Sequence, residues 1–365
     1  MTEPAPALKE IFNAERLRHI AEQTAAVHAG FDRRRFLRLA GQDLDALSLM
    51  QRLRRVSQAL HACLPDDYPR ALEILQALAP RLNHRFVTLV LPDYVACHGL
   101  HDFDLSMQAL RFFTPFGTSE YGVRPFLRQD LPRALAHLHA WTQDDDEHVR
   151  RLASEGARPR LPWSFHLDAL RRDPAPAAQI LERLKTDESL YVRKSVANHL
   201  NDIAKDNPEW LLQRLQGWST QDPRTAWIVR HGLRTLIKRG ERRALALVGA
   251  GEPAQVRLQA LAVQPGRLKL GGRIALSLTL VSTCSRPQRL VIDYAIHYVK
   301  RDGTAAPKVF KLKTLELPAG ATLTLTRTQR MQDFSTRRHH PGRHAIDLLV
   351  NGERLGGCEF TLLAG

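Results

Sequence analysis

A change in hydrophobic spacing at residues 249–253 divides the chain into two parts that must fold differently. From Leu8 to Gly249 the apolar residues recur at three- and four-residue spacing between Gly and Pro breaks, which is the pattern of α-helices. Beyond this point, apolar residues such as Ile274, Leu276 and Leu278 alternate with polar or small ones, as in half-buried strands. The sequence therefore predicts an all-helical part followed by a β-sheet part.

Internal similarity indicates how the helices are organised. Val149, Val192 and Val229 are each followed by Arg and then by a basic residue or histidine, and each is expected to open a helix. Their intervals of 43 and 37 residues are close to the period of HEAT-type helical pairs, which stack into a solenoid with a concave surface. Individual helices are expected at 11–27, 46–60, 86–97 and 177–184.

The β part has the size and strand count of an immunoglobulin-like sandwich, about seven strands in about 110 residues. The expected strands are 256–263, 274–280, 290–298, 309–317, 323–328, 346–350 and 358–362. We therefore predict a multidomain chain, α then β: a HEAT-like helical-repeat solenoid at 1–250 and an immunoglobulin-like β-sandwich at 255–365.

The charge balance favours a polyanionic partner. Lys and Arg number 53 against 38 Asp and Glu, a net charge of +15, which indicates nucleic acid. From Gln255 onward, 17 basic residues face 7 acidic ones, so most of the excess lies in the sandwich. Its densest cluster contains Arg337, Arg338 and Arg343, and we expect it to form a turn that clamps the DNA backbone. The histidines of that cluster, His339, His340 and His344, are interpreted as facing phosphates rather than a metal.

Other features narrow the function classes. The amphipathic stretches are read as core-facing helices rather than membrane helices, and residues 1–9 lack the apolar run of a secretory signal. A cytoplasmic, nucleoid-associated and monomeric protein is expected. Cys63 and Cys97 fall in expected helices and Cys284 and Cys358 in expected strands, without metal-ligand spacing, so reduced structural cysteines, no metal and no cofactor are predicted.

A departure from the repeat suggests where chemistry takes place. Six residues beyond the repeated Val, the second and third segments have Asn198 and Thr235 inside helices expected to continue. The first segment has Glu155 followed by Gly156, and then a proline-bracketed loop, 157–163. A broken local rule in a regular array is where a functional residue is expected.

Glu155 and Trp163, which ends this loop, are the principal candidates, each with a structural alternative. Glu155 could be a solvated glutamate paired with Arg151, and Trp163 could be a core anchor for the next helix. Together they suit a cationic base: the aromatic face attracts the positive charge, and the carboxylate stabilises an oxocarbenium-like sugar or orients water.

Two further carboxylates are catalytic candidates. Glu120 lies at an expected helix start, where it could simply complement the helix dipole. Asp202 follows Asn198 by one helical turn, and a polar contact between neighbouring repeats is its more favoured interpretation.

Basic residues at repeat spacing are candidate phosphate contacts, with surface charge on solvated helices as the alternative. Those at repeat spacing are Arg150, Arg151, Arg193, Lys194 and Arg230. Further candidates are Arg158 and Arg160 in the loop after Glu155, and Lys238 and Arg239, which close the third expected helix. The last two could instead be ordinary cations at a helix carboxyl end.

Three motifs are similar to those of a known family. Residues 9–13, 148–163 and 191–206 resemble bacterial DNA alkylation repair glycosylases of the AlkC and AlkD superfamily, and are closer to AlkC. The resemblance covers about Leu8 to Gly249, and the sandwich is similar to the immunoglobulin-like extension of some AlkC proteins.

This resemblance implies a monofunctional DNA glycosylase that removes cationic alkylated bases, 3-methyladenine and 3-methylcytosine, from duplex DNA. It implies that the duplex is gripped without placing the base in a deep pocket, unlike base-flipping enzymes. Glu155 and Trp163 match the family's catalytic carboxylate and lesion-facing aromatic residue, and Glu120 is a second acid. The competing hypothesis is a non-enzymatic helical-repeat scaffold that binds DNA or an acidic protein.

Overall fold

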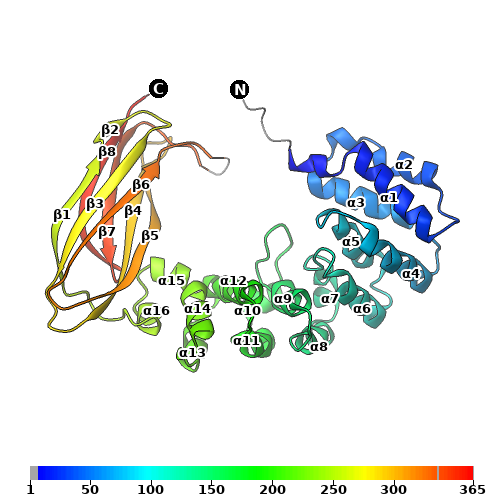
Figure 1. Ribbon diagram of the computed structural model, residues 1–365, viewed down its shortest axis with the longest axis horizontal. Coiled ribbons are helices and arrows are strands. Elements are labelled where there is room, and N and C mark those ends of the chain that lie inside the picture. The colour runs from blue at the N-terminus through cyan, green and yellow to red at the C-terminus, as the bar shows by residue number, and fades with distance from the viewer. Residues whose placement is uncertain (1–6, 335–336, 365) are drawn as a thin grey trace. The chain divides into compact units, whose positions relative to one another are not determined.

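The computed structural model describes residues 7–334 and 337–364, which divide into two compact units, 1–207 and 208–365. Figure 1 shows the elements of both units. The first is helical. The second begins with helices and continues as a β-sandwich, with the change from helix to strand between residues 247 and 256. The fold class is therefore the predicted one: helices followed by an immunoglobulin-like sandwich. The assignment of 1–250 and 255–365 as functional domains stays a prediction.

Several helices of the first unit begin where the sequence supplies a capping residue. The side chains of Asn13, Asp67 and Asp130 accept hydrogen bonds from backbone N–H groups three residues further on, at 2.9, 2.9 and 3.1 Å. The helices are α1 (Ala14–Val27), α2 (Arg33–Gly41), α3 (Leu49–His61), α4 (Tyr68–Leu78), α5 (Val90–His98), α6 (Phe103–Phe113), α7 (Arg124–Gln129), α8 (Leu131–Trp141), α9 (Glu147–Gly156), α10 (Asp168–Arg172), α11 (Ala178–Leu184) and α12 (Leu190–Asp206).

Short 3-10 helices join some of these elements: η1 (Leu8–Ile11), η2 (Leu44–Ala46), η3 (Ala79–Arg81), η4 (Val87–Leu89) and η5 (Ala175–Ala177). Helices that are separated in sequence pack against each other, as α3 does on α5, α4 on α6 and α9 on α12. This stacking of helices is the helical-repeat arrangement that the sequence predicts.

The repeat is visible in the hydrogen bonds of two equivalent arginines. In α9, Arg150 Nη1 donates to the carbonyl oxygens of Asp144 and Asp145 at 2.8 and 2.9 Å. In α12, Arg193 Nη1 donates to those of Asp187 and Glu188 at 2.7 and 2.8 Å. Each arginine thus fastens its helix to the preceding turn.

The third predicted repeat is displaced by one helical turn. Asp222 caps α14 (Pro223–Gly232), so Val229 lies in the last turn of that helix rather than opening it. Thr225 occupies the position that Val149 and Val192 hold relative to their caps. A four-residue shift keeps the same helix face, which explains why the sequence match was misleading. Thr235 lies in a separate helix, α15 (Arg234–Lys238).

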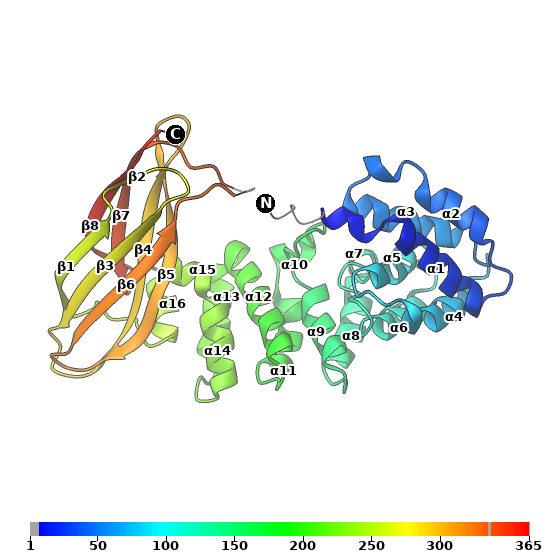
Figure 2. The same cartoon turned by 45° about the horizontal axis from the view of Figure 1, so that its top comes forward.

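The second unit completes its helices with α13 (Pro208–Gln216) and α16 (Arg242–Leu247) and continues as two stacked sheets (Figure 2). The strands are β1 (Val256–Gln264), β2 (Arg267–Leu268), β3 (Arg273–Ser282), β4 (Gln288–Val299), β5 (Ala305–Leu317), β6 (Thr322–Arg330), β7 (Gly342–Val350) and β8 (Glu353–Leu362). One sheet has the order β1-β3-β6 and the other β2-β8-β7-β4-β5.

Apolar residues that alternate along the strands fill the space between the sheets, among them Leu278, Ile292, Tyr294, Ile346 and Phe360. The seven predicted strands are confirmed, and β2 is the short addition. All four cysteines are free, but Cys63 follows α3 and Cys284 follows β3 instead of lying within them.

Candidate active site

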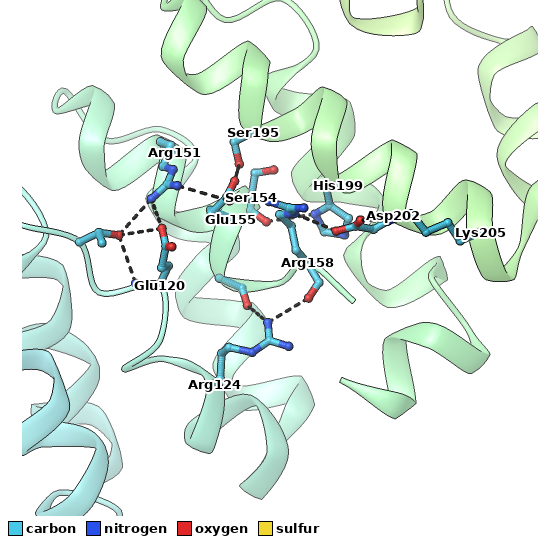
Figure 3. Close-up of polar contacts among 12 residues, drawn as sticks. Glu120, Arg124, Arg151, Ser154, Glu155, Arg158, Ser195, His199, Asp202 and Lys205 are labelled. Atoms are coloured by element: carbon cyan, nitrogen blue, oxygen red, sulfur yellow. Dashed lines mark hydrogen bonds and ion pairs between the residues drawn. The ribbon is translucent and has the colours of Figure 1, made fainter. Parts of the chain in front are cut away.

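Glu155, in the last turn of α9, lies at the centre of a network of alternating charges (Figure 3). Its side chain accepts hydrogen bonds from Arg158 Nη1 and Ser195 Oγ, both at 2.6 Å, and Arg151 Nη2 lies 3.3 Å from its Oε1. Glu155 is only 5% exposed. The solvated surface glutamate that the sequence left open is therefore wrong, although the pairing with Arg151 is present.

The network extends to two further carboxylates. Arg151 also pairs with Glu120, which accepts a hydrogen bond from Thr118 Oγ1 at 3.1 Å. Arg158 Nε donates to Asp202 Oδ2 at 2.8 Å, and Lys205 Nζ donates to Asp202 Oδ1 at 2.9 Å. The structure thus brings the three predicted acidic residues together, with cations between them.

The elements that supply these carboxylates differ from the prediction in one case. Glu120 lies in the link between α6 and α7, four residues before α7 begins, and not at a helix start. Asp202 makes the contact between neighbouring repeats that the sequence favoured, from α12 to the segment after α9. A catalytic role for either residue stays a prediction.

Electrostatics keep the network charged. Burial would lower the pKa of Arg158, but the carboxylates of Glu155 and Asp202 outweigh burial and raise it. The same balance, with Glu155 and Glu120, raises the pKa of Arg151. Removing one partner from such buried pairs leaves an uncompensated charge at a cost of about 3–5 kcal/mol. The carboxylates are therefore held in fixed positions, and such a preorganised arrangement can stabilise a developing positive charge.

His199 lies beside this network and supports it as a neutral group. It is fully buried in α12, and its Nδ1 lies 3.0 Å from the carbonyl oxygen of Ser154. Burial lowers the pKa of His199 to about 4, so the ring adds no charge near neutral pH.

Trp163 lies in the loop that follows α9, and its surroundings contradict one interpretation. The side chain is 66% exposed, so Trp163 is not a core anchor. Its backbone is left-handed, with φ at 64°, a conformation that is rare for a bulky residue and that clusters at functional sites. The structure thus presents an aromatic ring to solvent on a constrained loop.

Searches against known proteins match this chain on both of its parts. The family described as "DNA alkylation repair enzyme" matches residues 114–236, and "Uncharacterised protein YhaZ, C-terminal Ig-like domain" matches residues 257–364. "Uncharacterized protein YhaZ" of Bacillus subtilis (strain 168) is 42% identical over 356 residues, 97% of this chain and 99% of the relative.

A solved structure of Pseudomonas fluorescens alkylpurine DNA glycosylase AlkC, bound to DNA containing an abasic site analog, is 58% identical, with a TM-score of 0.95. The match covers 98% of this chain and 100% of that one. The chain belongs to the AlkC family. Because the match to AlkC is nearly complete, the family resemblance drawn from three motifs is confirmed for the helical part and for the sandwich alike.

Several predicted phosphate contacts of this AlkC family member have internal partners. Arg150 pairs with Asp187 at 2.7 Å, in addition to its bonds to the carbonyl oxygens of the preceding turn. Arg193 makes equivalent carbonyl bonds. Arg160 pairs with Asp206 through Nε and Nη2, both at 2.6 Å. Arg151 and Arg158 belong to the carboxylate network, so most of the predicted phosphate contacts of the helical part have internal partners. Their contact with DNA stays a prediction.

Other predicted contacts are exposed. Lys194, Lys238 and Arg239 lie at the surface and form no ion pair among the described residues. Arg230 is half-buried and lines a small cavity of the second unit together with Lys238 and Asp293. As α14 is displaced in the repeat, Arg230 is not equivalent to Arg150 or Arg193.

The basic cluster of the AlkC-family sandwich is only partly a turn. Arg337 and Arg338 lie between β6 and β7, and Arg337 stacks over Tyr298 at 4.7 Å from the ring centroid. Arg343 lies in β7 and pairs with Glu359, although both side chains are exposed.

Two of the three histidines in this cluster contradict the prediction that they face phosphates. His344 is fully buried and stacks on Phe360, and His339 is 8% exposed and packs against Tyr298. Both therefore belong to the sandwich core and do not face phosphates. Among the residues that the structure describes, no cluster of three metal-ligating side chains occurs, and no helix is long and apolar enough to cross a membrane.

Sequence reasoning missed four residues near the site: Ser195, His199, Arg124 and Arg128. Ser195, His199 and Asp202 are spaced by four and three residues, which places them on one face of α12, so this spacing could have revealed the first two. Arg124 is buried and Arg128 stacks on Phe165 at 3.5 Å from the ring centroid. No pattern in the sequence distinguishes these two arginines, because the groups that they contact lie in a loop far along the chain.

Proposed function

We propose that this protein is a monofunctional DNA glycosylase that hydrolyses the N-glycosidic bond of cationic alkylated bases in duplex DNA. The observation that carries the proposal is the near-complete match to an alkylpurine DNA glycosylase bound to DNA with an abasic site analog, the product side of such a reaction. The lesions we expect are 3-methyladenine and 3-methylcytosine. We also propose that the protein works as a monomer and that it acts at the nucleoid, in the cytoplasm.

The chemistry that we propose depends on the carboxylates. When the bond to a cationic base breaks, the base leaves neutral and the sugar develops positive charge. Glu155, with Glu120 and Asp202 in the same network, would stabilise that charge or orient the attacking water. Fixed carboxylates suit this function because they need no rearrangement at the moment of reaction.

The place of these carboxylates supports action without a deep base-binding pocket. Glu155 and Glu120 lie just beneath the surface, at 5% and 8% exposure. Two surface grooves of the first unit lie beside Phe165, and neither carboxylate is among their lining residues. Trp163, exposed on its loop, would contact the lesion by a cation–π interaction.

DNA binding would be shared by both units. In the first, we propose the exposed Lys194 together with Arg128, which lines both grooves beside Phe165 and forms no ion pair among the described residues. In the second, Lys238, Arg239 and Arg338 are the exposed candidates. Weaker candidates are the predicted arginines of the helical part that have internal partners, together with Arg230, Arg337 and Arg343.

The experiment that tests the proposal measures released bases. Full-length protein is incubated with N-methylated duplex DNA, and free 3-methyladenine and 3-methylcytosine are quantified by mass spectrometry. Release of either base above the rate of a protein-free control supports the glycosylase. Duplex binding without release of any base would favour the scaffold hypothesis instead.

A further inference from the structure

Arg124, the first residue of α7, is a fully buried arginine whose contacts are unusual. Among the described residues it forms no ion pair with a carboxylate. Its Nη1 donates to the carbonyl oxygens of Gly156 and Arg158 at 3.0 and 2.9 Å, and its Nη2 donates to that of Phe165 at 2.5 Å. Figure 3 shows Arg124 below Arg158, pointing toward the backbone of the segment after α9.

These three carbonyl groups belong to the two ends of one loop. Gly156 ends α9, and Phe165 follows Trp163 by two residues. Within the loop, the backbone N–H of Leu167 donates to Pro159 at 3.1 Å, and that of Ser164 to Leu161 at 3.4 Å, close to the limit of a hydrogen bond. The guanidinium fork of Arg124 therefore supplies much of the closure of the Trp163 loop, residues 157–167.

The side chain of Phe165 reinforces the same attachment. The guanidinium carbon of Arg124 lies 5.3 Å from the Phe165 ring centroid, and that of Arg128 lies 3.5 Å from it. Burial lowers the pKa of Arg124 to about 10, so the group remains charged at neutral pH. A charged donor makes stronger hydrogen bonds to carbonyl oxygens than a neutral one.

We propose that Arg124 is a positioning residue for base excision: it holds the loop that carries Trp163, and the backbone of Arg158, in the conformation that the reaction requires. This inference rests on the proposed function. Arg124 itself does not touch the substrate. It affects excision indirectly, by fixing the position of Trp163 and the hydrogen bond that Arg158 donates to Glu155.

The matched control is Arg52, a second buried arginine that donates to backbone carbonyl groups elsewhere in the first unit. Unlike Arg124, it also lies 3.4 Å from Glu10 and 3.7 Å from Asp45, whose side chains are exposed. Arg52 is 1% exposed, and its Nη1 donates to the carbonyl oxygens of Lys9 and Phe12, both at 3.1 Å. It therefore ties down the segment before α1, which carries no candidate catalytic residue. Replacing it perturbs a buried guanidinium of similar kind without touching the Trp163 loop.

The experiment compares Arg124→Lys with Arg52→Lys in the full-length protein. Lysine keeps the charge but cannot reproduce the planar fork. Hydrogen exchange by mass spectrometry should show faster exchange of peptides covering 157–167 in Arg124→Lys, and of peptides covering 7–14 in Arg52→Lys. Single-turnover base release should fall about 10- to 100-fold in Arg124→Lys only, with the Kd for undamaged duplex changed less than threefold.

A double-mutant cycle separates positioning from general destabilisation. If Arg124 acts mainly through the loop, Arg124→Lys should lower the rate much less in the Trp163→Ala background than in the wild type. Full additivity, or unchanged exchange in 157–167, would overturn the proposal. Should Arg124→Lys fail to fold, Arg124→Gln, which keeps two N–H donors, is measured in the same way.

Failure of the proposed function is distinguishable from failure of this inference. If the wild-type protein releases no base, the glycosylase proposal fails, whatever the exchange data show. If it releases bases and Arg124→Lys does so at the wild-type rate with a loosened loop, the glycosylase stands and the positioning role is wrong.

Discussion

Around Glu155 in the first unit, the charged side chains are buried and each carboxylate has a cationic partner. Along the segment from β6 to β7 in the second unit, the charged side chains are mostly exposed, and Arg338 forms no ion pair among the described residues. Exposed charges contribute little to stability, whereas buried pairs fix geometry. We infer that the first arrangement suits chemistry, which needs fixed groups, and the second suits long-range attraction to phosphates, which needs free charge.

The same contrast separates two buried carboxylates. Asp202 in the first unit receives hydrogen bonds from Arg158 and Lys205. Asp293 in β4 is 5% exposed and forms no ion pair among the described residues. Burial raises the pKa of Asp293 to about 6, in spite of the opposing effects of Lys238 and Lys311. A buried carboxylate with no cation in ion-pair contact among the described residues is thus a cost to the second unit at neutral pH.

The largest effect is expected for Glu155→Gln. The neutral amide keeps the shape of the side chain but loses the charge that would face the sugar cation, so single-turnover base release should fall about 100- to 1,000-fold. Affinity for duplex DNA should stay nearly unchanged, as measured by fluorescence anisotropy. Because Arg151 and Arg158 lose a carboxylate, a drop in melting temperature is also expected. Wild-type turnover would remove Glu155 from the catalytic role.

Asp293→Asn tests the cost of the unpaired carboxylate. The pKa of Asp293 is higher in the folded chain, about 6, than its ordinary 3.8, so the folded state binds the proton more tightly. The stabilisation that comes from this tighter proton binding is complete below pH 3.8 and is lost as the pH rises through 6. The free energy of unfolding should thus fall by about 2–3 kcal/mol across this window.

The Asp293→Asn variant should lack this component of the pH dependence and be more stable than the wild type at pH 8. Calorimetric unfolding at pH 4 and pH 8 measures the difference. Equal pH dependence of the two proteins would contradict the contrast between Asp293 and Asp202.

Trp163→Ala should affect selectivity more than stability. The ring is 66% exposed, so its removal costs little folding free energy. A cation–π contact contributes about 1–2 kcal/mol at a desolvated site, so excision of a cationic base should slow by roughly 5- to 30-fold. Rates on 3-methyladenine DNA and melting curves check both expectations. Unaltered excision would exclude contact between Trp163 and the lesion.

The smallest effects are expected for the sandwich arginines, and they should differ from one another. Replacing Arg337, Arg338 and Arg343 together by alanine should weaken duplex binding by up to about tenfold at physiological salt. The slope of log affinity against log salt should decrease by about 0.9 for each phosphate that is no longer neutralised. Arg338→Ala alone should account for most of this change, because Arg337 stacks on Tyr298 and Arg343 pairs with Glu359.

Arg150→Ala is the control for that series. Its guanidinium bonds Asp187 and two backbone carbonyl groups, so its loss should lower the melting temperature and leave the salt slope unaltered. A reduced slope for Arg150→Ala would show that an internally paired arginine also contacts phosphate. An unaltered slope for the triple variant would mean that the sandwich serves another partner.

Much of the fold followed from local patterns. The switch from helical to alternating spacing placed the strands, because side-chain period depends only on the backbone conformation. The equivalence of Val149 and Val192 was predicted correctly, because both valines occupy the same position after the cap of their helix. Val229 was misplaced because helix faces repeat every turn, and only the cap at Asp222 defines where α14 begins. Burial of His339 and His344 could not be read from a run of basic residues.

The sequence by itself determined the residue types of the candidate site: Glu155 at a broken helix, Trp163 on the loop that follows, and the acids Glu120 and Asp202. Only the tertiary structure decided which arginines pair with those acids and which, like Arg338, form no ion pair among the described residues. The sequence does not distinguish Arg150, Arg158 and Arg338, because each has other charged residues close to it along the chain. Their functions diverge because pairing depends on which carboxylates and carbonyl groups distant segments bring within hydrogen-bond distance.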